Sequence, residues 1–457
     1  MADITALTLT QTLKALDDKE FSLEELNEAY LKRIEKYNPE LNAYLYVNND
    51  NKKIPAAIKE VIVTRGIPTT ASAKILERFI PPYDATVINN LFEQGVGVLG
   101  KTNNDEFAMG GSGENSAYRV TKNPWDITKV PGGSSSGSAA AVASDLCVFA
   151  LGSDTGGSIR QPASLTGIVG LKPTYGRVSR YGLIAMASSL DQIGPMTKSV
   201  EDAALVLEWI SGSDGYDANA SSKKFKVKSE KLKSGIKGLK VGVPKEYFAV
   251  PAGRQREGLD PKVKRVIEEA IKKIEELGAE IVEISLPHSE YALAAYYIIV
   301  SSEVSSNMAR YDGIRYGKGR ETIGPEVKRR IMLGTYSLSS GYWDDYYAKA
   351  AKVRTLVKRD FEKAYEKVDV IVGPVSPTVA WSIGEKIDDP LTMYLQDIYT
   401  ISANLAGVPG LSVPCGFVDG LPVGLQILGK QWDEETILRV GYAYEQATDF
   451  HKEKPKL

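Results

Sequence analysis

Two segments rich in glycine and serine constrain the fold of this chain more than any other feature. Residues 132–138 read Gly-Gly-Ser-Ser-Ser-Gly-Ser, and residues 154–162 read Asp-Thr-Gly-Gly-Ser-Ile-Arg-Gln-Pro. An isolated stretch of the first kind is often a flexible linker. Here a run of small apolar residues, 139–143, follows directly, which is typical of a buried helix that begins at a glycine-rich N-terminus. Neither segment has a phosphate-loop or dinucleotide-binding pattern.

The serines in these segments indicate a nucleophile that works without histidine. A serine hydroxyl needs a neighbouring base, and lysine is a known alternative to histidine. The only two histidines, His288 in a turn and His451 in the charged C-terminal tail, lie far in sequence from the serines. The residues around Ser158 also depart from the G-x-S-x-G pattern of α/β-hydrolases. Lys59, which directly follows the apolar run 54–58, is the candidate base.

The glycines before Ser158 meet a second requirement of acyl transfer, a site for a negatively charged oxygen. Gly156 and Gly157 let the backbone turn tightly and direct N–H groups into a concave space. Such donors stabilise the oxyanion of a tetrahedral intermediate. We therefore expect an oxyanion hole formed by the backbone N–H groups of Thr155, Gly156, Gly157 and Ser158.

The run from Gly132 to Ala163 resembles the amidase signature family, with matching residues at Gly152, Asp154, Gly156, Ser158, Arg160 and Pro162. The family uses a lysine, a serine in a cis peptide and a nucleophilic serine. The resemblance implies that Ser158 is the nucleophile, Ser134 the bridging serine and Lys59 the base. It also implies an α/β fold, in which a mixed, mostly parallel β-sheet is covered by helices on both faces.

The resemblance is closer to one branch, the A subunits of glutamyl-tRNA(Gln) amidotransferases. It is carried by the segments 103–110, 170–182, 310–317, 338–342 and 404–410. It implies that the chain hydrolyses glutamine and passes the ammonia to a partner subunit, within a heterotrimer that it forms with B and C subunits. The partner would use ATP and Mg and hold the misacylated tRNA, whereas this chain would bind no cofactor and no metal. Whether that tRNA is Glu-tRNA(Gln) or Asp-tRNA(Asn) stays open.

Free glutamine needs an anionic partner for its α-ammonium and a cationic one for its α-carboxylate. By resemblance these roles fall to Asp397 and Arg330, and Tyr296 lines the same pocket. Arg329 and Tyr297 are alternatives displaced by one residue.

The chain departs from the family pattern around the catalytic lysine. Lys59 is followed by Glu60 and Val61 where Asp-Asn is usual, and the segment 48–52 is too short for the helix that normally precedes this strand. Lys52 and Lys53 are competing candidates, but they lie in a polar turn, whereas desolvation at the end of an apolar strand favours a neutral amine.

Ser136 replaces a glycine that is common in this branch. A positive φ angle at this position would cost a serine roughly 1–2 kcal/mol.

Two other functions remain open at this point. A stand-alone amidase acting on another carboxamide would use the same serines without a partner. A non-catalytic scaffold is favoured by the changes around Lys59 and opposed by the presence of both Ser134 and Ser158.

Composition agrees with an intracellular enzyme. The 457 residues, 43% of them hydrophobic, suffice for a large core, and the formal net charge of −2 provides no field that attracts tRNA. Cys147 and Cys415 are too few for a disulfide framework and are expected to be buried thiols. Met1 is followed by Ala-Asp-Ile rather than a basic and apolar signal, and no apolar run of ~18 residues is present. We therefore expect a cytoplasmic protein that does not contact a membrane.

We expect a single domain over residues 1–457. It consists of an N-terminal helical region (1–47), a catalytic core (54–200), a surface excursion (215–233) and a second part of the α/β core (239–450). Hydrophobic periodicity predicts helices over residues 7–36 and 261–277, with a capped start near residues 21–25. Strands are predicted at residues 96–99, 148–151 and 280–284.

Overall fold

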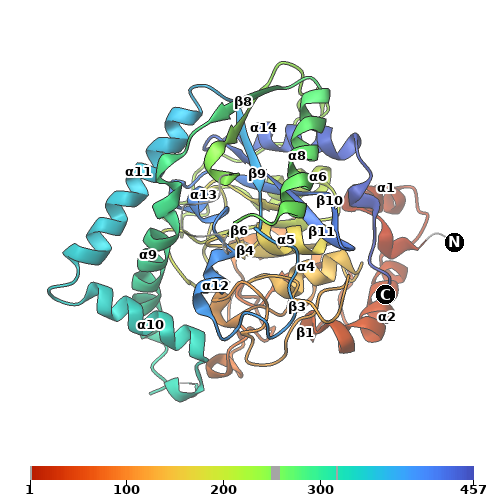
Figure 1. The fold of residues 1–457 in the computed structure, drawn as a ribbon. Helices are drawn as coiled ribbons and strands as arrows, with labels where there is room; N and C mark the ends of the chain where they lie inside the picture. The colour runs from red at the N-terminus through yellow and green to blue at the C-terminus, as the bar shows by residue number, and fades with distance from the viewer. Residues whose placement is uncertain (1–2, 249–257, 315–316) are drawn as a thin grey trace.

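In the part of the chain that the structure describes, the fold is organised around one sheet of eleven strands (Figure 1). The computed structural model describes residues 3–248, 258–314 and 317–457, so Arg315 and Tyr316 of the quoted segment 310–317 lie outside the described residues. The strands follow the spatial order β1-β3-β2-β4-β6-β5-β10-β11-β9-β7-β8. Their bounds are β1 Tyr44–Val47, β2 Ile54–Lys59, β3 Val96–Thr102, β4 Phe149–Asp154, β5 Val169–Lys172, β6 Gln192–Thr197, β7 Lys240–Pro244, β8 Glu280–Ile284, β9 Val370–Pro374, β10 Gly410–Val418 and β11 Leu421–Gly429.

The sheet is mixed, as expected, but the expectation that it is mostly parallel was wrong. Strand β2 pairs in parallel with β3 and β4, and β7 pairs in parallel with β8 and β9. The other six pairings are antiparallel. One of these is a hairpin, in which Asp419 and Gly420 connect β10 to β11 with positive φ angles of 52° and 81°. Two-residue turns of this kind match the right-handed twist of antiparallel strands.

Helices cover both faces of the sheet. Successive residues of a strand point to opposite faces. A side chain at Gly410 of β10 would meet Arg160 of α5, whereas Leu411, the next residue, lies against Gly441 of α14. The helices span α1 Leu9–Asp17, α2 Leu23–Leu41, α3 Thr86–Glu93, α4 Ser136–Ala143, α5 Arg160–Thr166, α6 Val200–Ile210, α7 Ser229–Leu232, α8 Pro261–Glu276, α9 Ala292–Asn307, α10 Pro325–Leu338, α11 Lys349–Ala364, α12 Pro390–Leu395, α13 Ile401–Ala406 and α14 Glu434–Gln446.

Local signals in the sequence predicted several of these elements well. The helix expected at 261–277 is α8, whose cap Asp260 accepts hydrogen bonds from the N–H groups of Lys262 and Val263. The strand expected at 280–284 is β8, with the same bounds. The single helical region expected over residues 7–36 is divided into α1 and α2, and Ser22 and Glu25 form a capping box at the start of α2.

The connection between β1 and β2 contains no helix, in agreement with its short length in the sequence. Helices α9, α10 and α11 form a separate layer at one side of the molecule (Figure 1). None of the helices in the described ranges combines the length and apolar character that crossing a membrane requires.

Candidate active site

Lys59 is the last residue of β2, a strand that lies between β3 and β4 inside the sheet. Its side chain is fully buried. The amine Nζ lies 2.8 Å from Ser134 Oγ, 2.9 Å from Ser135 Oγ and 2.9 Å from Ser153 Oγ. Lys52 and Lys53, the competing candidates, are exposed in the turn before this strand. The structure therefore brings Lys59, and neither competitor, to the serine-rich loop.

Burial also changes the proton affinity of Lys59. It lowers the pKa of the amine from an ordinary value of 10.5 to about 7, although Asp105, Asp154 and Asp191 act in the opposite direction. A neutral amine surrounded by hydroxyl groups is able to accept a proton from one of them.

The loop of Ser134 is held by close backbone contacts. The peptide bond between Gly133 and Ser134 is cis. The Gly133 N–H donates to Gln161 Oε1 at 2.9 Å, and a side chain at Gly133 would collide with the carboxylate of Asp105. Ser136 is the first residue of α4 and has no positive φ angle, so the strain considered for a serine at this position does not arise.

Ser158 lies in the turn between β4 and α5, beside the loop of Ser134. The Ser135 N–H donates to the Ser158 carbonyl oxygen at 3.2 Å. Asp154 organises this turn by accepting hydrogen bonds from the N–H of Ile159 at 3.2 Å and from Arg160 Nε at 3.1 Å. Burial by itself would raise the pKa of Asp154, but the Arg160 guanidinium holds it well below its usual range. The turn is therefore built on a buried ion pair.

One of the four expected oxyanion donors is already engaged. The Gly157 N–H donates to Asp154 Oδ1 at 2.9 Å, which removes it from the set expected from the sequence. Within the described residues, the N–H groups of Thr155, Gly156 and Ser158 have no protein acceptor. These three donors remain for a negatively charged oxygen.

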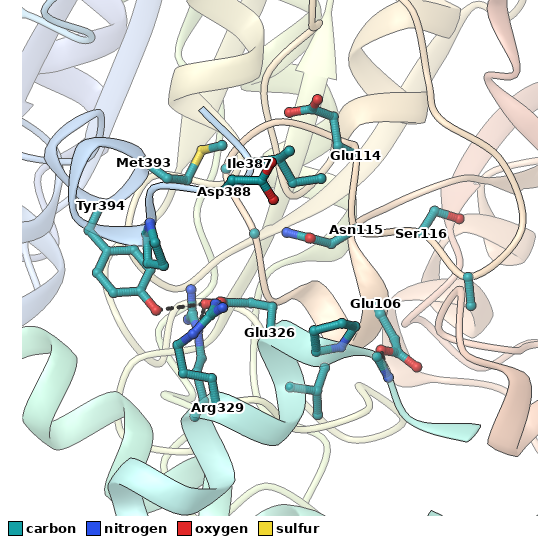
Figure 2. A pocket seen from close by; sticks show the side chains of 18 of the residues that line it. Glu106, Glu114, Asn115, Ser116, Glu326, Arg329, Ile387, Asp388, Met393 and Tyr394 are labelled. Carbon is teal, nitrogen blue, oxygen red and sulfur yellow. Dashed lines mark hydrogen bonds and ion pairs between the residues drawn. The ribbon is translucent and has the colours of Figure 1, made fainter. Parts of the chain in front are cut away.

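Figure 2 shows a pocket of about 410 Å³. The charged residues expected to bind the substrate, Arg330 and Asp397, belong to its lining. The lining combines apolar residues with polar and charged ones, which include Glu106, Glu114, Asn115, Glu326, Arg329, Arg330, Asp388 and Asp397. Gly111, in the same lining, accepts a hydrogen bond from Gln161 Nε2 at 2.9 Å. Since Gln161 also binds Gly133, the pocket wall and the loop of Ser134 share one side chain.

Arg330 and Asp397 carry opposite charges into this pocket. Arg330 is 4% exposed, and its Nε donates to Glu326 Oε1 at 2.7 Å. Among the described residues its Nη1 and Nη2 groups have no hydrogen-bond acceptor, so both remain available for a ligand. Burial raises the pKa of Asp397 to about 7, while the hydroxyl of Tyr297 and the charge of Arg330 act in the opposite direction.

The two neighbouring tyrosines of α9 occupy different places. Tyr297 lines the pocket and donates to Asp397 Oδ2 at 3.0 Å, so the alternative displaced by one residue is the one found in the lining. The hydroxyl of Tyr296 lies against Gly156, where any side chain would collide with it. Tyr296 therefore contacts the turn before Ser158 rather than the pocket lining.

Arg329, the other alternative, lines the pocket but is paired with Glu326 and partly exposed.

Glu326 and Tyr394 were missed in the sequence. The Tyr394 hydroxyl donates to Glu326 Oε1 at 2.9 Å, and its ring stacks on Tyr297 with centroids 3.8 Å apart. The spacing of Glu326 four residues before Arg330 was the only signal in the sequence, because such pairs meet on one helix face. Nothing near Tyr394 in the sequence indicated its partners.

In the described ranges no group of three or more His, Cys, Asp or Glu side chains is arranged to hold a metal ion. Cys147 and Cys415 are buried and free.

Comparison with known proteins places this geometry in a family. The Amidase family model matches residues 25–438. The A subunit of glutamyl-tRNA(Gln) amidotransferase from Thermoanaerobacter pseudethanolicus is 55% identical, with 98% of each chain covered.

Solved structures agree with this placement. The crystal structure of the A subunit of glutamyl-tRNA(Gln) amidotransferase from Thermotoga maritima is 45% identical, with a TM-score of 0.86 over 98% of this chain and 96% of that chain. A 6-aminohexanoate cyclic dimer hydrolase has a TM-score of 0.90 at 25% identity over 99% of each chain. The chain therefore belongs to the amidase family, and it is similar over nearly its full length to members named as A subunits of glutamyl-tRNA(Gln) amidotransferase.

Proposed function

We propose that this chain is the glutaminase subunit of a tRNA-dependent amidotransferase, which releases ammonia from glutamine for the amidation of Glu-tRNA(Gln). The observation that carries the substrate assignment is the presence of Arg330 and Asp397 in one pocket. A free α-amino acid has one carboxylate and one ammonium group, and this pair of side chains complements both. The high identity over full length to relatives named as A subunits of this amidotransferase supports the same assignment.

In the proposed reaction Ser158 Oγ attacks the side-chain amide carbon of glutamine. Ser134 takes the proton of Ser158 and passes its own to Lys59, whose neutral amine lies 2.8 Å from Ser134 Oγ. The N–H groups of Thr155, Gly156 and Ser158 stabilise the resulting oxyanion. The proton then returns through Ser134 to the amide nitrogen, so that ammonia leaves and an ester of glutamate on Ser158 remains. Water hydrolyses this ester and releases glutamate.

Recognition of glutamine uses the two charged side chains that lie on either side of Tyr297. The Nη groups of Arg330 bind the α-carboxylate, and the free oxygen of Asp397 accepts from the α-ammonium. Tyr297 orients Asp397 through its hydroxyl. Because Tyr296 contacts Gly156, we propose that it supports the oxyanion turn instead of binding the amino acid directly.

The remaining steps belong to partner proteins. We propose a heterotrimer with B and C subunits, in which the partner holds the misacylated tRNA and uses ATP and Mg. A partner that presents Asp-tRNA(Asn) would use the same ammonia source. No cofactor has a role in the steps assigned to this chain.

The nucleophile assignment is tested by glutaminase turnover of Ser158→Ala in the assembled complex. We expect a loss of ~10³-fold or more, because the substitution removes the oxygen on which the ester forms. Ser164→Ala is the matched control, since Ser164 Oγ is buried in α5 and, among the residues that the structure describes, accepts only the Gly424 N–H. We expect the control to keep turnover within about threefold of the parent. Near-normal turnover of Ser158→Ala contradicts the assignment.

An amidase that acts alone on another carboxamide is the second candidate, favoured by the TM-score of 0.90 to a cyclic dimer hydrolase. Arg330→Ala separates the two. Loss of glutamine affinity by tenfold or more supports glutamine as the substrate, whereas unchanged affinity supports another amide. A non-catalytic scaffold is opposed by the placement of the Lys59 amine against Ser134, and absence of any covalent adduct on Ser158 with an acyl-transfer inhibitor would favour it.

A further inference from the structure

Residues 105–108 connect the loop of Ser134 to the pocket helix α10. The Asp105 N–H donates to the Ser134 carbonyl oxygen at 3.3 Å. The Asp105 carboxylate accepts from the N–H groups of Gly113 and Asn115 at 3.1 and 3.0 Å. One end of this segment is therefore anchored at the candidate bridging serine.

The next residue, Glu106, reaches in the other direction. Its Oε2 accepts from the Gly324 N–H at 2.7 Å, at the beginning of α10. Figure 2 shows Glu106 among the residues around the pocket. The residue is 1% exposed and lines the pocket, and its Oε1 is buried with no hydrogen-bond partner in the described part of the chain. Burying a carboxylate with one unsatisfied oxygen costs stability, so this side chain is poorly explained as a stabilising contact alone.

Helix α10 depends on an outside acceptor at its N-terminus. Its cap is Gly324, which has no side chain to accept a hydrogen bond. The first N–H groups of a helix lack partners within the helix and carry partial positive charge, so a carboxylate there is stabilising. A side chain at Gly324 would collide with Glu106 Oε2, which shows how closely the two approach.

The same helix carries Arg330, six residues after Gly324 and roughly 9 Å further along the helix axis. A helix moves as a rigid element, so a shift of its first turn also moves the guanidinium. The segment that holds this turn has an unusual backbone, with positive φ angles at Phe107 (51°) and Ala108 (62°). Such conformations persist where the surroundings enforce them, and here the Phe107 ring packs on Tyr311 with centroids 5.0 Å apart.

We propose that Glu106 is a positioning residue, which holds the beginning of α10 so that Arg330 lies at the distance from Ser134 that glutamine requires. The inference rests on the proposed function, because it concerns how the same pocket receives an α-carboxylate. Glu106 itself does not contact the reacting atoms.

The test compares Glu106→Ala with Glu106→Gln in the assembled complex at pH 8. This pH keeps the carboxylate of the parent ionised, because burial raises the pKa of Glu106 to about 7. We expect Glu106→Ala to raise the KM for glutamine by tenfold or more with kcat changed less than threefold. Glu106→Gln retains an oxygen that accepts from Gly324, so its KM should stay within threefold of the parent.

A second measurement separates positioning from general damage. Covalent labelling of Ser158 by phenylmethanesulfonyl fluoride needs the reactive serine but not Arg330, so Glu106→Ala should label at the parent rate within about twofold. Glu445→Ala is the matched control, because Glu445 is also buried and accepts the Val200 N–H at the beginning of another helix, α6. It should leave the KM unchanged. If Glu106→Ala does not assemble, Gly324→Ala displaces the carboxylate from the other side and should raise the KM equally.

Three results overturn the inference. The first is an unchanged KM in Glu106→Ala while Arg330→Ala raises it, which leaves the proposed function intact. The second is a fall in Ser158 labelling by the same factor as the rise in KM, which indicates general loss of structure. The third is an unchanged KM in Arg330→Ala, which overturns the glutamine assignment and this inference with it.

Discussion

At the scale of single residues, two buried lysines with similarly lowered pKa values differ in function because their hydrogen-bond partners differ. Burial lowers the pKa of both Lys59 and Lys172 to about 7. Lys172 Nζ donates to the carbonyl oxygens of Pro173 and Val408 at 2.9 and 2.6 Å. A carbonyl oxygen has no proton to give, whereas the hydroxyl of Ser134 beside Lys59 has one. Lys172 therefore holds the backbone, and Lys59 is placed to transfer a proton.

The pH dependence of Ser158 reactivity follows from this difference. The base must be neutral, so the rate of labelling of Ser158 by phenylmethanesulfonyl fluoride should rise with pH through about 7, the lowered pKa of Lys59. Asp397→Asn is the control, because Asp397 also has a pKa of about 7 but has no role in this labelling. The control should keep the same midpoint, and Lys59→Met should lose most of the labelling at every pH. A rate that is flat from about pH 5.5 to 9 contradicts Lys59 as the base.

At the scale of elements, the pocket is assembled from helices that are distant in sequence. Helix α9 contributes Tyr297, α10 contributes Arg330, and Asp397 follows α12. Tyr394 of α12 connects the three, because it bonds to Glu326 on α10 and stacks on Tyr297 of α9. The orientation of Arg330 thus depends on packing between helices as well as on its own helix.

Substitution of Tyr394 separates these two contacts. Tyr394→Phe keeps the stacked ring and loses one hydrogen bond, worth about 0.5–1.5 kcal/mol, so the KM for glutamine should rise about 2- to 13-fold. Tyr394→Ala also loses the aromatic pair, worth about another 0.5–1.5 kcal/mol, and should raise the KM further. Steady-state glutaminase kinetics of the complex measure both. An equal KM in the two variants would show that the ring contributes nothing to orienting Arg330.

At the scale of the whole molecule, the proposed reaction needs a second site, which we assign to the partner subunits. Ammonia released without an acceptor is wasted, so turnover should depend on the partner that activates the misacylated tRNA. If tRNA bound at the acceptor site changes the affinity of the glutamine site, thermodynamic linkage requires that bound glutamine change the affinity for tRNA by the same factor.

The dependence of glutamine turnover on the partner is measured by comparing the isolated chain with the assembled complex. We expect the isolated chain to turn glutamine over at least tenfold more slowly than the complex supplied with ATP and misacylated tRNA. The folded state of the isolated chain is checked by its labelling at Ser158. Turnover that is equally fast in the isolated chain, and insensitive to tRNA and ATP, would leave an amidase that acts alone.

Several elements of the fold, and the residues of the candidate site, were predictable from the sequence because their signals are local. The bounds of β8 and the beginning of α8 follow from short-range periodicity and capping. The glycine-rich segments carried the family resemblance from which the roles of Ser134 and Ser158 were predicted, and the apolar run of β2 favoured Lys59 over Lys53, in agreement with the contact between Lys59 and Ser134. These signals are confined to a few neighbouring residues, where propensity and burial act directly.

The remaining features were decided only by tertiary structure. The choice of Tyr297 over Tyr296 depends on how α9 is rotated against Asp397, one hundred residues away. The engagement of the Gly157 N–H by Asp154 and the antiparallel centre of the sheet depend on turn geometry and strand order. Glu106 gains its partner Gly324 across 218 residues. Such contacts arise because packing brings together elements that are distant in the chain, and no local signal in the sequence encodes them. The sequence by itself therefore determined the glycine- and serine-rich segments and the strand of Lys59, whereas the folded arrangement determined which side chains surround them.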